Sequence, residues 1–373
     1  MSDVVVVWKP IQAAWRRGDF TDVWLLVKPA PGVELDLPVV EAAAEKATDD
    51  LDVDGTDEGT VGGSSIDLST GVAVYLARTG DTDNLRRWLQ RFATLLTQHG
   101  YAGEIKAAPL AYPPSWTAEL ERYQMTLFIA YRTEGDTQGP SSGPIPWAVP
   151  PESTRRLMRA SVSWAVRADD QAHHLMLGTF SSRLGKAPDI SRTADILATG
   201  VPAYGQGGLW ALHRRTRRAR VVSFSVPGLG VYSYADDALS WRDRLDDLLP
   251  LLREDTESID LAMVRPGPLW AVDWFSMEAN GPPMDVPPAW FRTHRDRLID
   301  TVPDAHGVQL LTGAHLDRAR DLSNWVIDQI APDRYLVTAP DLEPWFATGV
   351  ADPAVVAAAR ADFGDMLRWR DAA

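Results

Sequence analysis

Short apolar runs alternate with segments of helical periodicity in the first third of the chain. A helix is predicted from Pro38, because proline is favoured at the first helical position and apolar residues then recur at helical spacing. A second helix carries one apolar stripe from Leu85 to Leu96. The runs that are bounded by turn-forming residues predict strands at Val4–Trp8, Val23–Lys28, Ser65–Leu68, Val72–Arg78 and Ala102–Ala107. The last six elements follow the β-α-β-β-α-β order of a ferredoxin-like (split βαβ) module.

The element order repeats after a segment rich in Gly, Pro and Ser, residues 133–153, which predicts a linker or a long exposed loop. At Met158–Val166 every second residue is apolar, the pattern of a half-buried strand. A hairpin is predicted at residues 209–226, and an amphipathic helix from Trp241 leads into a strand at Ile259–Val264. The predicted fold class is therefore α+β, with tandem ferredoxin-like modules, antiparallel sheets and a C-terminal α/β extension. A shared element order without a shared fold is the alternative.

The last part of the chain is less regular. Predicted strands are Leu269–Phe275, Val308–Thr312 and Tyr335–Thr338, and predicted helices are Trp290–Ile299, Leu322–Ile330 and a segment from Pro353. These elements could extend the sheet of the second module or form a third unit. The predicted divisions are an N-terminal α+β module (1–132), the linker (133–153), a second α+β module (154–268) and a C-terminal α/β extension that packs on it (269–373).

Composition narrows the possible classes. The 373 residues include no cysteine, which excludes disulfides, thiolate zinc sites and cysteine nucleophiles. The net charge of −14 opposes binding to nucleic acid, while it is compatible with solubility alone or with a basic protein partner. With no signal-peptide pattern and no apolar run near the roughly 18 residues of a membrane helix, we expect a cytoplasmic protein without membrane contact. Basic residues are mostly arginine, which suggests a bacterial or phage genome rich in GC.

An acidic stretch opens like a calcium-binding loop, with carboxylates at alternate positions followed by Gly55. The candidate ligands are Asp50, Asp52, Asp54 and Glu58. Val61 stands at the twelfth position, where such a loop needs a bidentate Glu. A solvated helix end and loop is the alternative interpretation.

A run of arginines lies at the turn of the predicted hairpin. The members are Arg214, Arg215, Arg217, Arg218 and Arg220. They could grip phosphate or a carboxylate-rich partner through bidentate hydrogen bonds, or form a solvated hairpin tip. Trp147, in the proline-rich linker, is a second candidate for partner contact, although packing within the same chain is equally compatible with its position.

Histidine and glycine patterns predict no catalytic residue and no cofactor. Metal sites on helices favour histidines three or four residues apart, and this sequence has no such pair. His173 and His174 are adjacent in a predicted strand, so they point to opposite faces. The glycine-rich segments precede strands, whereas loops that cradle phosphate precede helices. His294 and His315, each two residues from an aspartate, remain the acid–base candidates.

Two segments resemble immunity proteins of bacterial polymorphic-toxin and type VI effector systems. The first, Ala219–Arg265, runs from a strand through a leucine-rich helix into an apolar strand. The second, Gly307–Arg334, has a strand ending in Thr312-Gly313 and closes with Pro-Asp-Arg at residues 332–334. The resemblance covers mainly residues 219–338. It implies an acidic cytoplasmic protein that occludes a cognate toxin and catalyses nothing.

Three functional hypotheses follow. The first is a non-enzymatic protein-binding module that neutralises a toxin or inhibits another partner. The second is an enzyme or small-ligand binder with a site between modules, where His294, His315 and the arginine run would be tested. The third is a structural or assembly component of a phage or bacterial particle. The sequence does not determine the oligomeric state.

Overall fold

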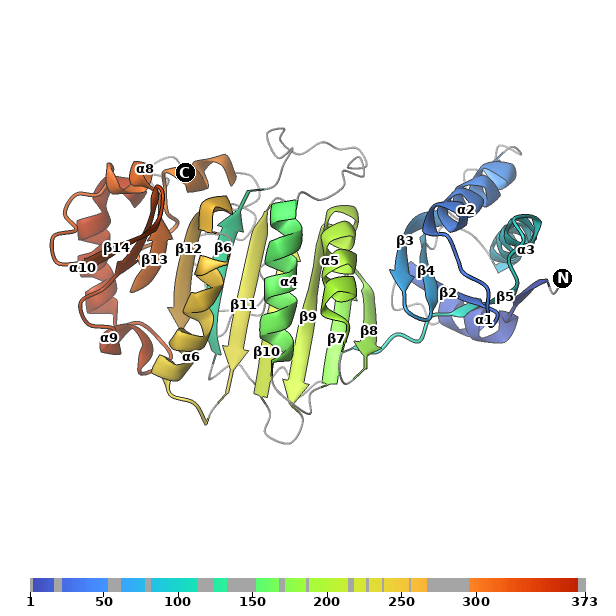
Figure 1. The fold of residues 1–373 in the computed structure, drawn as a ribbon, viewed down its shortest axis with the longest axis horizontal. Coiled ribbons are helices and arrows are strands. Elements are labelled where there is room, and N and C mark those ends of the chain that lie inside the picture. Colours follow the sequence, from blue (N-terminus) through green and yellow to red (C-terminus); the bar gives the residue numbers. More distant parts are fainter. Residues whose placement is uncertain are drawn as a thin grey trace. The chain divides into compact units, whose positions relative to one another are not determined.

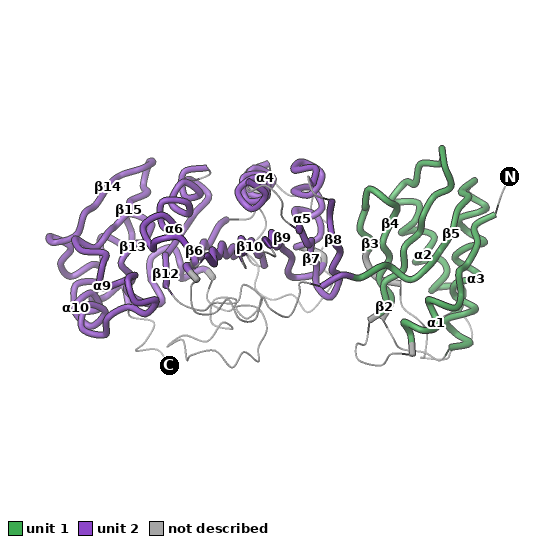
Figure 2. The backbone as a smooth tube through the Cα atoms, turned by 90° about the horizontal axis from the view of Figure 1, so that it is seen from below, with its two compact units in different colours: residues 1–110 green, residues 111–373 purple. Residues whose placement is uncertain are grey.

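The computed structural model describes residues 3–16, 22–52, 62–77, 82–112, 124–132, 152–167, 172–185, 188–213, 218–225, 228–236, 238–254, 256–266 and 295–367. The chain is mixed α+β and forms two compact units, Met1–Leu110 and Ala111–Ala373 (Figure 2). Within the described part, no helix combines the length and the apolar character needed to cross a bilayer.

The described residues of unit 1 form a five-stranded sheet with helices α1, α2 and α3. Its elements are β1 (Val4–Val6), α1 (Trp8–Arg16), β2 (Asp22–Pro29), α2 (Leu37–Asp52), β3 (Gly62–Leu68), β4 (Gly71–Ala77), α3 (Thr82–Gln98) and β5 (Gly103–Ala107). The strand order is β1-β5-β2-β4-β3, and all neighbours are antiparallel except β1 and β5. From β2 to β5 the chain keeps the predicted β-α-β-β-α-β order.

The core of unit 1 confirms the apolar stripe predicted on α3. Leu85, Trp88, Leu89 and Phe92 are completely buried and lie in one cluster with residues of α2 and the sheet. Helix α1 is not predicted by the sequence pattern, in which Val4–Trp8 reads entirely as a strand. The strand ends at Val6 and the helix begins at Trp8.

The described strands of unit 2 form one ten-stranded antiparallel sheet. Its order is β14-β15-β13-β12-β6-β11-β10-β9-β7-β8. The strands are β6 (Gln124–Tyr131), β7 (Ala172–Leu177), β8 (Phe180–Leu184), β9 (Gln206–His213), β10 (Arg218–Ser225), β11 (Leu229–Ala235), β12 (Ile259–Pro266), β13 (Val308–Leu311), β14 (Val326–Ala331) and β15 (Arg334–Thr338).

Helices of unit 2 pack on this sheet and beside its C-terminal end. The α-helices are α4 (Glu152–Val166), α5 (Ile190–Tyr204), α6 (Trp241–Leu248), α8 (Gly313–Leu316), α9 (Glu343–Phe346) and α10 (Pro353–Phe363). Short 3-10 turns are η2 (Leu249–Arg253), η3 (Thr256–Ser258) and η4 (Arg295–Ile299). Helices α4, α5 and α6 lie on one face of the sheet (Figure 1).

Two central strands, β6 and β11, were not predicted from the sequence. Residues 125–131 of β6 and every residue of β11 are buried. Strands covered on both faces lose the alternation of apolar and polar residues that marks a half-buried strand. β6 pairs with β11 on one side and β12 on the other, although it lies within the range 1–132 predicted as the N-terminal module.

The strand predicted at Met158–Val166 is wrong, because this segment belongs to helix α4. The buried residues here include Leu157, Met158, Ser161 and Val162, which recur at helical spacing. The alternation that predicted a strand omitted Leu157 and Ser161. This strand opened the supposed second module, and the tandem ferredoxin-like arrangement is not confirmed.

The helix predicted at Leu322–Ile330 is also wrong. β14 pairs with β15 from Val326 onward, and the turn between the two strands contains Pro332 and Asp333. The β-branched residues of β14 favour a strand. β13 pairs with β12, so residues of the predicted C-terminal extension continue the sheet of unit 2.

Several predictions lie outside the described residues. These are linker residues 133–151, the strand Leu269–Phe275, and residues 290–294 of the helix predicted at Trp290–Ile299. The described remainder of that helix forms η4, and Glu152 of the predicted linker begins α4.

Candidate functional site

The arginine run divides at Arg218. Arg214, Arg215 and Arg217 lie outside the described residues, as does Trp147. Arg218 belongs to β10, and its Nε lies 2.9 Å from a carboxylate oxygen of Asp236, whose side chain is fully buried. This arginine therefore neutralises a buried charge at the end of β11.

Arg220 packs within unit 2. Its guanidinium donates to the carbonyl of Trp164 at 2.7 Å and to the carboxylate of Asp247 at 3.2 Å. The same group lies over the rings of Trp164 and Tyr234, at 5.3 and 5.1 Å from their centroids. The side chain is only 13% exposed. Arg220 thus joins β10 to α4, β11 and α6.

The candidate calcium ligands are only partly described. Asp54 and Glu58 lie outside the described residues, and Asp52 is the last residue of α2. The Asp50 carboxylate accepts hydrogen bonds from Lys46 and, at 2.6 Å, from Arg91. These bonds, first that of Lys46, lower the pKa of Asp50. Across the described ranges, His, Asp and Glu form no group of three that could hold a metal.

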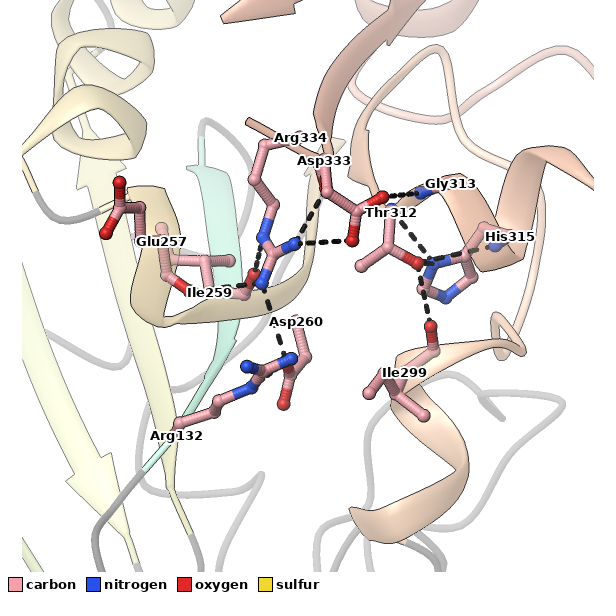
Figure 3. Close-up of polar contacts among 10 residues, drawn as sticks. All are labelled: Arg132, Glu257, Ile259, Asp260, Ile299, Thr312, Gly313, His315, Asp333 and Arg334. Carbon is pink, nitrogen blue, oxygen red and sulfur yellow. Dashed lines mark hydrogen bonds and ion pairs between the residues drawn. The ribbon is translucent and has the colours of Figure 1, made fainter. Parts of the chain in front are cut away.

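The residues that carry the immunity-protein resemblance meet in a polar corner (Figure 3). We use this name for Thr312, Gly313, His315, Asp333 and Arg334. The N–H of Gly313 donates to a carboxylate oxygen of Asp333 at 2.8 Å. A Cβ at position 313 would lie 2.6 Å from that oxygen, so a larger residue there would have to displace the Asp333 carboxylate. The Thr-Gly and Pro-Asp-Arg motifs therefore bind each other.

Asp333 has an unusual backbone conformation. Its φ of 55° makes it the sole non-glycine residue with a positive φ in the described part of the chain. Asp and Asn tolerate this left-handed region better than most residues. Pro332 fixes the preceding φ, which suits a tight turn. The strained turn aims the carboxylate at the start of α8.

The guanidinium of Arg334 is buried and satisfied mainly by backbone carbonyls. It donates to the carbonyls of Ile259 at 2.5 Å, Asp333 at 2.7 Å and Glu257 at 3.0 Å. The side chain is 5% exposed. Since Ile259 begins β12 and Glu257 lies in η3, this one residue fastens the β14–β15 hairpin to the main sheet.

Asp260 is the second anion close to Arg334, after the Asp333 carboxylate at 3.2 Å. It is 5% exposed and lies 3.9 Å from Arg334. Arg132, just after β6, donates to the same carboxylate oxygen at 2.6 Å. The sequence analysis singled out neither Asp260 nor Arg132. The available signal was an aspartate inside the apolar run Ile259–Val264, because a buried carboxylate needs a cationic partner.

His315 is a structural histidine of the polar corner. It is completely buried, and burial lowers its pKa to about 4. Its Nδ1 accepts from the N–H of Thr312 at 3.1 Å, so the proton lies on Nε2, which faces the carbonyl of Thr301 at 3.3 Å. The Thr312 hydroxyl donates to the carbonyl of Ile299 at 2.8 Å. His294, the other acid–base candidate, lies outside the described residues.

A cavity of about 320 Å³ lies next to α8. It is lined by Asp317, Arg318, Ala319, Arg320 and Asp365. Two cationic and two anionic side chains line it, so they offer no net charge that would select an ionic ligand. Arg318 also forms an ion pair with Asp300 at 2.7 Å.

Strand β14, at the end of the sheet, is exposed on both faces. Its first four residues, 326–329, are all exposed, and consecutive residues of a strand point to opposite faces. Val326 is 59% exposed and Ile327 is 43% exposed. Trp325 anchors the start of the strand, since its indole N–H donates to Asp362 at 3.1 Å and its ring packs against Phe363. The polar corner anchors the other end.

Comparison with protein-family models, with curated proteins and with solved structures finds no match to this chain. The interpretation of the site therefore depends on its geometry alone. That geometry is a buried, internally satisfied polar corner that supports an exposed strand.

We predict that Arg220→Ala lowers the free energy of unfolding of unit 2 by about 3 kcal/mol, because it removes hydrogen bonds to a carbonyl and to a carboxylate at a mostly buried position. Arg183→Ala, on the exposed part of β8, is the matched control and should change stability by less than about 0.5 kcal/mol. Urea denaturation measures both. Equal effects of the two substitutions would contradict the structural role of Arg220.

Substitutions at Asp333 separate strain from hydrogen bonding. Asp333→Asn should cost about 0.5–1 kcal/mol, because asparagine tolerates a positive φ and its carbonyl can accept from Gly313, while its NH2 group replaces the oxygen that accepts from Arg334 at 3.2 Å. Asp333→Ala should cost about 1–2 kcal/mol, since it loses the acceptor and keeps the strain. Thermal unfolding tests the order Asp, Asn, Ala. An alanine variant as stable as the asparagine variant would refute it.

Burial of His315 predicts a pH-dependent stability. The folded pKa of about 4 lies below the usual histidine pKa of 6.5, so the unfolded chain binds the proton more tightly. The contribution is present above pH 6.5 and is lost as the pH falls toward 4, by at most about 1.4 kcal/mol per pH unit. In urea denaturation across this range, His315→Asn should flatten the pH dependence, whereas His99→Asn, at an exposed position, should not. Parallel curves for the wild type and His315→Asn would contradict the assignment.

Proposed function

We propose that this chain is a cytoplasmic, non-enzymatic protein-binding module that inhibits a basic partner protein, in the manner of a toxin-neutralising immunity protein. The observation that carries the proposal is the exposed, apolar and acidic strand β14. A soluble protein normally protects such an edge with lysine, proline or a covering segment. Among the described strands β14 is the last of the sheet, and an edge strand that the fold supports by two separate anchors suits recognition of another chain.

The polar corner supports a binding role over a catalytic one. Its ionisable groups either are buried or hold the backbone in place, as Arg334 and Asp333 do. His315 uses both ring nitrogens inside the fold. A general acid or base must reach a substrate proton, and a completely buried imidazole does not reach solvent. The motifs that carry the resemblance thus build the support for β14.

The net charge of −14 supports a basic partner. Complementary charge speeds association and raises specificity, because it steers the encounter of the two proteins. Inhibition would then follow from occlusion of the partner's functional surface and would need no chemistry from this chain.

The test is capture followed by reconstitution. The tagged protein is used to capture proteins from native-host lysate. Each basic protein that is captured in stoichiometric amount is identified and then expressed alone in a bacterium. We expect one such protein to arrest growth, and co-expression of this chain to restore it. An unrelated protein of similar net charge is the control for non-specific electrostatic binding.

A result against the proposal is also clear. A partner-free monomer, together with a thermal shift on addition of a nucleotide or a metal ion, would favour the enzyme or ligand-binding hypothesis instead. Growth restored equally by the unrelated acidic protein would show that charge alone explains the effect.

A further inference from the structure

The outer edge of β14 offers a backbone surface for another strand. β14 ends the sheet of described strands, with β15 paired on one side only. From the geometry of this edge we infer that β14 accepts a basic, extended segment of the partner, which adds to the sheet as a further strand. This inference rests on the proposed function and names where and how the partner would bind.

The side chains of β14 are suited to such an addition. A strand at a sheet edge presents unpaired N–H and C=O groups that can template another strand. Val326 and Ile327 are neighbours on opposite faces, so each face of the added strand would meet one exposed apolar side chain. β-branched residues pack well against cross-strand neighbours. The edge therefore provides both backbone hydrogen bonds and side-chain contacts.

The charge around β14 selects a basic strand. Residues 321–333 include Asp321, Asp328 and Asp333 and no Lys or Arg. All three aspartates are exposed. Glu257 of η3, a turn that contacts β14, is exposed as well. The nearest following cation, Arg334, is buried, and its donors bind carbonyls and, at 3.2 Å, the Asp333 carboxylate. The acidic character of the edge therefore comes mainly from Asp321, Asp328 and Glu257. An incoming strand with lysine or arginine would neutralise this edge.

A second copy of this chain is a poor occupant of the same edge. Two β14 strands paired with each other would bring both sets of three aspartates together without a cation from either segment. Like charges placed across paired strands are destabilising. The same charges that favour a basic strand thus oppose self-association at this surface.

The edge can be blocked without disturbing the core. Val326→Lys with Ile327→Lys keeps exposed positions exposed and adds the charge with which natural proteins protect edges. Val350→Lys is the matched control, because Val350 is 68% exposed and lies outside β14. Each variant is checked by thermal unfolding before binding is measured, and we expect both to unfold close to the wild-type temperature because exposed positions contribute little to the core.

The first probe is a pair of synthetic ten-residue peptides in which Val and Thr alternate with Lys or with Glu. Binding to the full chain is followed by titration and by hydrogen exchange of residues 326–331. We expect the lysine peptide to protect these amides and the glutamate peptide to bind at least about tenfold more weakly. The double lysine variant should lose a similar factor, and Val350→Lys should match the wild type.

Several outcomes would overturn the inference. They are no protection of β14 by the lysine peptide, equal binding of both peptides, or a concentration-dependent dimer that protects β14 without any peptide. The captured partner gives an independent test. If it binds the wild type and the double lysine variant equally, strand addition at β14 is refuted while the proposed function stands. If the peptide protects β14 but no inhibited partner exists, the proposed function fails and the edge inference survives.

Discussion

The buried guanidinium of Arg334 is the contact on which the C-terminal part of unit 2 depends. A charge removed from water must recover its hydration through hydrogen bonds and a counter-ion. Arg334 does so with three backbone carbonyls, with the Asp333 carboxylate at 3.2 Å and, at a longer distance, with Asp260. Two of these carbonyls, those of Glu257 and Ile259, lie within the three residues before Asp260 in the chain. These bonds hold the β14–β15 hairpin at one position on the sheet. Hydrogen bonds are directional, so they define this position more narrowly than apolar packing alone would.

The polar corner extends this constraint along the chain. Arg334 fixes the start of β15, and Asp333 beside it reaches across to Gly313 at the end of the next strand of the sheet. Thr312 and His315 then close the first turn of α8 by reciprocal hydrogen bonds. The contacts of Arg334 with Ile259 and Glu257 and of Asp333 with Gly313 join residues far apart in sequence, whereas the Thr312–His315 bonds are local. This explains how β14 can remain exposed on both faces without losing its place: its position depends on its ends and on its pairing with β15.

The sequence predicted elements where one local pattern was sufficient. The stripe from Leu85 to Leu96 has a single period and gives a helix, and it was predicted correctly. The segment Met158–Val166 fits both the two-residue period of a strand and the period of a helix. The helical period also accounts for the buried Leu157 just before the segment. β6 has no alternation because both its faces are covered. Its burial depends on partners far away in the sequence, which a single local pattern does not contain.

The candidate site shows the same division between local and distant information. The Thr-Gly and Pro-Asp-Arg motifs were visible in the sequence, and they proved to lie together. The role of these residues could not be predicted, because the sequence does not distinguish a buried arginine that binds carbonyls from an exposed arginine that binds a ligand. Arg220 is an example: it belongs to the run predicted to bind a partner, and its guanidinium binds the carbonyl and the ring of Trp164 inside the fold. What distinguishes binding from support is where the donors point. In this corner the donors of Arg334 point inward, onto backbone carbonyls and Asp333. The surface proposed for binding is the exposed strand β14, and the exposure of a strand depends on the whole fold rather than on a local motif.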